Sequence, residues 1–218
     1  MRSAHDHLHA FLADKGGGPA VEFALIAVPL LLITFGILEF GFALYQWNAA
    51  EKATQLGARL AVASWPIPNG LETVDCKNTQ NLGDTCAAGD SFGTITCTSS
   101  STGACSAATA SCSGGSGYSG ARNDIFRNIC ARMQGVHPFI TPQNVQISYT
   151  DIPQLRFAGR GYTSTLTAGG VVPEIEVRLR NMNFNFILAG PMFGVDTLPM
   201  PQTRATLIGE DMNSGPQS

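Results

Sequence analysis

A continuous apolar segment near the amino terminus dominates the pattern of hydrophobic and polar positions in this 218-residue chain. From Phe23 to Tyr45 the only charged residue is Glu39. A helix needs about 20 predominantly apolar residues to cross the hydrocarbon core of a bilayer. Tyr45 and Trp47 follow where aromatic side chains gather at a membrane interface. We therefore predict a membrane-spanning helix over about residues 20–45.

The helical pattern continues beyond the apolar segment. Small and apolar residues recur at spacings of three and four, at Ala49, Ala53, Leu56, Leu60 and Ala63. The sequence Trp65-Pro66-Ile67-Pro68 then ends the pattern. We predict one long helix over residues 18–64, which Pro29 should kink or locally open. Its second half offers a seam of small residues to a partner or to the chain's own domain.

The remaining residues, 65–218, predict a small α+β domain. Residues 69–120 are rich in Ser, Gly, Thr and Cys with little periodicity, so we expect an irregular, disulfide-stapled insertion. A helix is predicted over residues 121–134. Alternating apolar and polar positions predict an antiparallel sheet with one buried face, from Val145–Tyr149, Glu174–Leu179 and Thr203–Ile208. The apolar stretch 183–194 is expected to rest on the membrane or on another subunit.

All six cysteines follow the apolar segment: Cys76, Cys86, Cys97, Cys105, Cys112 and Cys130. None has C-x-x-C spacing and only one histidine, His137, follows them, so we expect no zinc site. An even number of cysteines in a loop-rich region favours disulfides in an oxidising compartment such as the periplasm. Free, buried thiols are the alternative, and the sequence does not choose among the possible pairings.

Charge and composition exclude other classes of function. The net charge is −3 and only 13% of residues are charged, so the chain has no basic surface for nucleic acid. No nucleophile and base stand in a catalytic pattern, so we expect neither enzyme activity nor a cofactor. The histidines His5, His7 and His9 lie in the polar leader, residues 1–17, and a metal role for them is disfavoured.

A family resemblance is carried by A-V-E-F-A-L-I-A-V-P-L-L-L-I-T-F-G-I-L-E-F-G and the following A-A-E-K-A-T-Q-L-G-A-R-L-A. These residues resemble the TadE-like family, minor pilins or pseudopilins of the bacterial Tad (Flp) tight-adherence pilus system. The resemblance covers about residues 16–64 well and the C-terminal strands loosely. Precursors in that family resemble type IV prepilins, which a membrane aspartyl peptidase cuts after a glycine. The resemblance implies a cut between Gly17 and Gly18, with Glu22 as the fifth mature residue and Phe23 at the aromatic position.

Two carboxylates in the apolar segment need partners or water, because a charge inside a membrane is costly. The implied cut would place a new amino group on Gly18, one helical turn from Glu22, in the same or a neighbouring subunit. The alternative for Glu22 is that it reaches the lipid headgroups. Glu39 either pairs across helices in an assembly or reaches headgroup water on the far side.

Together these features predict a single-pass protein of the bacterial inner membrane. Residues 1–17 would be a cytoplasmic leader and residues 65–218 a periplasmic α+β domain. The resemblance implies a non-catalytic role in Tad (Flp) pilus assembly, with prepilin peptidase and other pilus subunits and assembly proteins as partners, and possible incorporation in the pilus. The alternative is a permanently anchored, unprocessed scaffold or surface protein of the same secretion system.

Overall fold

The computed structural model describes residues 18–71, 74, 91–152, 172–186, 194 and 197–209. The chain divides into two compact units. The first contains Met1–Leu44 and Asn185–Leu198, and the second contains Tyr45–Phe184 and Pro199–Ser218. A long helix and an antiparallel sheet confirm the predicted α+β class.

The long helix, α2, runs from Gly18 to Ala63 and contains 46 residues. At a rise of 1.5 Å per residue it is about 69 Å long. The helix is unbroken at Pro29. It ends one residue before the predicted end, so the prediction of a single helix that continues past the apolar segment is confirmed.

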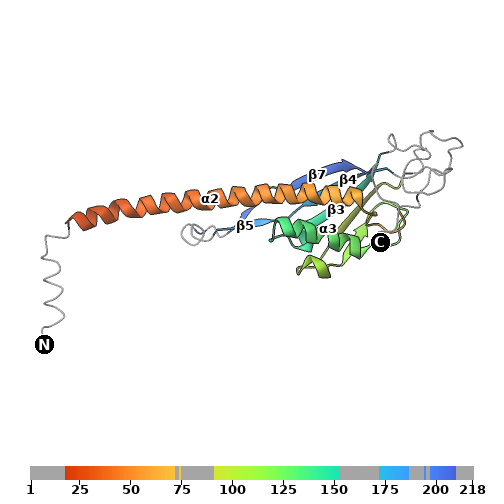
Figure 1. Cartoon of the computed structure of the whole chain (residues 1–218), viewed down its shortest axis with the longest axis horizontal. Helices are drawn as coiled ribbons and strands as arrows, with labels where there is room; N and C mark the ends of the chain where they lie inside the picture. The colour runs from red at the N-terminus through yellow and green to blue at the C-terminus, as the bar shows by residue number, and fades with distance from the viewer. Residues whose placement is uncertain are drawn as a thin grey trace, which may run out of the picture. The chain divides into compact units, whose positions relative to one another are not determined.

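A five-stranded antiparallel sheet forms the centre of the second unit (Figure 1). Its order is β2 (Ala110–Ser113), β1 (Thr94–Ser99), β3 (Val145–Asp151), β4 (Pro173–Leu179) and β7 (Thr203–Ile208). The three predicted strands are confirmed as β3, β4 and β7. A separate two-stranded sheet pairs β5 (Asn183–Asn185) with β6 (Thr197–Pro199). Within the predicted apolar stretch, residues 187–193 lie outside the described residues.

The prediction that residues 69–120 are irregular is wrong for β1 and β2. In β1 the alternating residues Ile95, Cys97 and Ser99 are buried, and threonines occupy the positions between them. A cysteine and a serine thus take core-facing positions that the sequence pattern assigned to a loop. Hydrogen bonding to β3 overrides the low apolar content of this stretch, because strand formation depends strongly on the neighbouring strands.

The core lies on one face of the sheet, where alternating residues of β3 and β4 are buried. The second half of α2 and helix α3 (Asn123–Val136) cover this face. Gly57 lies where α2 packs tightly against both α3 and β4. A Cβ atom added there would lie 2.6 Å from Sδ of Met133 in α3 and 3.2 Å from Cγ1 of Val177 in β4. The small residues of the predicted seam therefore serve the chain's own domain.

The loop after α2 is fixed by polar contacts to distant residues. The Ile67 N–H donates to the Tyr149 hydroxyl at 3.1 Å, and the Arg122 N–H donates to the Ile67 carbonyl at 2.8 Å. The Arg122 guanidinium donates to the Pro66 carbonyl at 2.9 Å and lies 5.2 Å from the centre of the Trp65 ring. Because the Tyr149 hydroxyl is fully buried, its pKa is raised and the phenol stays protonated. The end of α2 is thereby joined to both α3 and the sheet.

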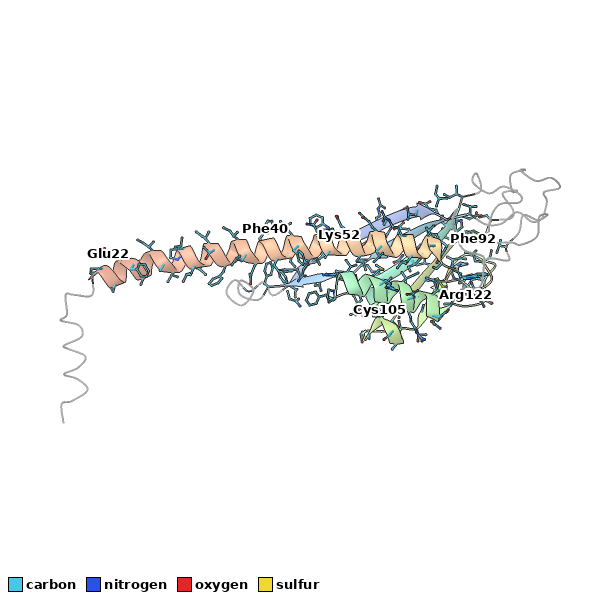
Figure 2. The ribbon with its side chains drawn as sticks, in the orientation of Figure 1. Glu22, Phe40, Lys52, Phe92, Cys105 and Arg122 are labelled. Carbon is cyan, nitrogen blue, oxygen red and sulfur yellow. A yellow bond between two sulfur atoms is a disulfide. The ribbon has the colours of Figure 1, made fainter. Side chains whose placement is uncertain are left out.

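Two disulfides fasten the stretch around β1 and β2. Cys97 and Cys112 are direct cross-strand partners of β1 and β2, and they are bonded to each other. Cys105 lies in the short helix η4 (Cys105–Ala107) and is bonded to Cys130 of α3 (Figure 2). A second short helix, η5 (Pro142–Asn144), precedes β3. Cys76 and Cys86 lie outside the described residues.

His137 ends α3 and is expected to make the stability of the domain sensitive to mild acid. Its side chain is 2% exposed, and among the described residues its Nε2 atom has no hydrogen-bond partner. Burial lowers the pKa of His137 below its ordinary value of 6.5, so the folded state favours the neutral ring. Below about pH 6.5 the unfolded state then binds more protons than the folded state, and the free energy of unfolding falls.

The test compares His137→Phe with the wild type in urea unfolding at pH 7.5, 6.5 and 5.5. Phenylalanine preserves an edge contact with Phe139, whose ring centre lies 5.7 Å from that of His137. The variant should lose less stability than the wild type between pH 7.5 and 5.5. His7→Gln in the leader is the matched control and should behave as the wild type. Equal acid sensitivity of His137→Phe and wild type would contradict the prediction.

Candidate functional site in the long helix

The first half of α2 is apolar on every side and exposed. No part of its most apolar 18-residue stretch is buried. Successive residues such as Leu25 and Ile26 are 71% and 68% exposed, and they point in directions about 100° apart. Soluble monomers rarely expose an apolar surface of this extent, and a helix that is hydrophobic all round is typical of a membrane span.

Among the described residues, α2 is the only helix long and apolar enough to cross a membrane, judged by length and composition. Figure 2 shows Glu22 and Phe40 projecting from this half of the helix, and Phe40 is 65% exposed. The helix is thus a candidate membrane span. The second half of the same helix is built into the core of the second unit through Ala53, Ala58 and Ala61, which are fully buried.

The residues of the expected cleavage motif lie at the start of α2. Gly18, Glu22 and Phe23 are exposed, and a Cβ atom added at Gly18 would meet nothing within 4 Å. Gly17 lies outside the described residues. Residues four apart on a helix share a face, so Gly18 and Glu22 lie on the same side of α2.

Glu39 differs from Glu22 in its surroundings. Its side chain is only 9% exposed, and it takes part in an interaction within the structure. The first unit groups this part of the helix with the segment Asn185–Leu198. Glu39 is therefore buried by the chain itself. Glu22, near the start of the helix, is open to an outside partner.

A polar cleft beside the second half of α2 was not predicted from the sequence. It is lined by Glu51, Gln55, Gln202, Thr203 and Arg204. The sequence pattern that could have indicated the helical wall of the cleft is the four-residue spacing of Trp47, Glu51 and Gln55. This spacing places all three residues on one face of the helix. The contribution of β7 had no signal, because Thr203 and Arg204 are far away in the sequence.

Among the described residues, no cluster of side chains is suited to binding a metal ion. No group of three or more His, Cys, Asp or Glu side chains there could hold a metal ion. The leader histidines His5, His7 and His9 lie outside the described residues. Four of the six cysteines are oxidised in the two disulfides and do not offer thiolates.

The fold and the helix together define a class of protein. It is an α+β domain with a long helix, and the exposed apolar half of that helix is a candidate membrane span. Within the chain, residues 17–59 match the family model described as TadE-like protein. The resemblance to the TadE-like family is therefore confirmed over this segment, which includes the whole apolar part of α2. No curated protein and no solved structure matches the chain.

Proposed function

We propose that this chain is a TadE-like minor pilin or pseudopilin that takes part in assembling a Tad (Flp)-type pilus and has no catalytic activity of its own. The observation that carries the proposal is the family match over residues 17–59, which spans the expected cleavage point and the apolar helix. The exposed apolar half of α2 supports it, because such a surface needs lipid or other helices around it.

The helix and the disulfides support an arrangement of the chain in the cell. Residues 1–17 form a cytoplasmic leader, residues 20–45 span the inner membrane, and residues 65–218 form the periplasmic domain. The disulfides Cys97–Cys112 and Cys105–Cys130 support this orientation, because such bonds persist in oxidising compartments. Prepilin peptidase would remove the leader, and the mature helix would then pack against other pilus subunits and assembly proteins.

Glu22 has a specific part in this mechanism. After the cut, the amino group of Gly18 is the charge that the Glu22 carboxylate can pair with, in the same or a neighbouring subunit. In a medium of low dielectric constant an unpaired carboxylate is expensive, so the pair favours a fixed register between subunits. The exposure of Glu22 supports a partner outside its own chain.

The test is a strain that lacks this chain, complemented with wild-type, Glu22→Gln or Asp124→Asn protein. Asp124 is an exposed acidic residue of α3 and serves as the matched control. Surface pili should disappear in the deletion strain, return with wild type and Asp124→Asn, and stay reduced with Glu22→Gln at equal protein level. Normal pili in the deletion strain would overturn the proposal.

The rival function is a permanently anchored scaffold or surface protein of the same secretion system. Shearing separates the two, because fibre subunits leave the cell with the pilus and anchored proteins stay in the membrane. Detection of the chain in the sheared fraction, starting at Gly18, would exclude the scaffold. A chain found only in membranes and starting at Met1 would favour it.

A further inference from the structure

The polar cleft beside α2 has the walls of a binding site for a small polar group. Its volume is about 320 Å³, which falls in the range of roughly 300–1,000 Å³ typical of small-molecule sites. One wall is α2, with Glu51 and Gln55, and the other is the start of β7, with Gln202 and Arg204. In Figure 1, β7 runs beside the second half of α2.

The floor of the cleft is held in place by a buried hydrogen-bond pair. The hydroxyl oxygens of Thr54 and Thr203 lie 2.8 Å apart, and the Thr54 hydroxyl also lies 2.8 Å from the Ala50 carbonyl oxygen. Because the Thr54 hydroxyl donates to that carbonyl, the Thr203 hydroxyl donates to Thr54. Thr54 is 1% exposed and Thr203 is 7% exposed. The two walls are therefore kept at a fixed separation by groups that a ligand does not need to disturb.

The rim carries opposite charges that do not neutralise each other. Among the described residues, neither the Glu51 carboxylate nor the Arg204 guanidinium forms an ion pair or a hydrogen bond, and both are exposed. Glu51 can accept hydrogen bonds from an ammonium group, and Arg204 can donate two parallel hydrogen bonds to a phosphate. The complementary ligand therefore carries a cation and an anion a short distance apart.

The position of the cleft along the axis of α2, relative to the expected membrane interface, indicates where such a ligand would come from. Tyr45 and Trp47, 68% and 38% exposed, occupy the expected interfacial belt. Glu51 is one helical turn beyond Trp47 on the same face, about 6 Å further along the axis. The polar layer of a bilayer extends about 5–8 Å beyond the hydrocarbon core on each side. In an anchored chain the cleft thus opens at the level of the lipid headgroups.

From this geometry we infer that the cleft binds the headgroup of a zwitterionic phospholipid that carries a primary amine, such as phosphatidylethanolamine. The phosphate lies against Arg204, the ammonium against Glu51, and the Gln55 and Gln202 amides complete the hydrogen bonding. The inference rests on the membrane anchoring in the proposed function, and it adds a lipid partner for the first turns of the periplasmic part of α2.

The chemistry of the pair predicts an order of preference among lipids. A primary ammonium donates hydrogen bonds to the Glu51 carboxylate, whereas the quaternary ammonium of phosphatidylcholine has no N–H group. Phosphatidylglycerol has no cation, and its net negative charge is repelled by Glu51. One charge-assisted hydrogen bond corresponds to a preference of about tenfold for phosphatidylethanolamine over phosphatidylcholine.

The experiment is native mass spectrometry of the full chain in detergent with equimolar phosphatidylethanolamine, phosphatidylcholine and phosphatidylglycerol of identical acyl chains. Glu51→Gln should bind phosphatidylethanolamine and phosphatidylcholine equally. Arg204→Gln should weaken the binding of all three lipids, because each carries a phosphate. The matched control is Lys52→Gln, an exposed neighbour that does not line the cleft, and it should retain the wild-type preference.

Three outcomes would overturn the inference. One is equal binding of the three lipids by the wild type. Another is a wild-type preference in Glu51→Gln together with undiminished lipid binding in Arg204→Gln. A third is displacement of the lipid by soluble phosphoethanolamine at equal concentration, which would make the ligand a free zwitterion.

Alkaline extraction of membranes is run in parallel. A chain that resists extraction but shows no lipid preference refutes only the lipid site, whereas a chain that is extracted refutes the anchoring and the lipid site together.

Discussion

Replacing Cys105 and Cys130 together by alanine is expected to lower the free energy of unfolding by about 3–4 kcal/mol, from the chain-entropy cost of a loop of this size. The bond joins residues 25 apart in sequence and ties η4 to α3. Both cysteines are fully buried in the core, so the substitution also removes packed sulfur atoms. The effect is a large part of the 5–15 kcal/mol that stabilises a typical domain.

Urea unfolding of the full chain in detergent, followed by tryptophan fluorescence, measures this loss. Trp65 reports on the domain because it stacks under Arg122 at the end of α2. Ser106→Ala, in the exposed part of the same short helix, is the matched control and should leave stability unchanged. A loss smaller than about 1 kcal/mol in the double variant would contradict the prediction.

Substitution of Gly17 by valine is expected to abolish removal of the leader. The family resemblance implies a cut after this glycine, and a peptidase that approaches the backbone closely there needs a residue without Cβ. Intact-mass and N-terminal analysis of the chain purified from membranes provides the measurement. The wild type should begin at Gly18 in a strain with prepilin peptidase and at Met1 in a strain without it, whereas Gly17→Val should begin at Met1 in both.

Gly16→Ala is the matched control for this substitution, because it changes a neighbouring glycine on the same side of the expected cut. It should be processed as the wild type is. A wild-type chain that begins at Met1 in both strains would refute the cleavage and leave the permanently anchored scaffold as the function. A Gly17→Val chain that is still cut would move the cleavage point to another residue.

The two parts of α2 lie in different environments. The half from Gly18 to Leu44 presents apolar side chains outward, and the half from Tyr45 to Ala63 contributes small residues to the core. Gly57 shows why the second half is rich in small residues, because Met133 and Val177 leave no room for a Cβ there. A larger residue in this seam would displace the helix from the sheet, with a typical cost of about 1–3 kcal/mol.

The sequence by itself determined the elements whose pattern is local. The long helix was predicted to within one residue, because an apolar run and a three-and-four spacing need no distant partner to be recognised. The strands β3 and β4 were predicted because one side of each faces the core, which imposes alternation. In β7 only Thr203 is buried, so the core imposes much less on its pattern. The expected cleavage motif and the two acidic residues of the apolar segment were likewise visible in the linear order of residues.

Only the tertiary structure decided which distant residues meet. Strands β1 and β2 form despite their serine and threonine content, since the register with β3 provides hydrogen bonds and a buried face. That register makes Cys97 and Cys112 direct neighbours, and the packing of η4 on α3 brings Cys105 to Cys130. The cleft likewise exists because β7 comes to lie along α2. Such contacts depend on chain topology, and local residue patterns carry no information about them.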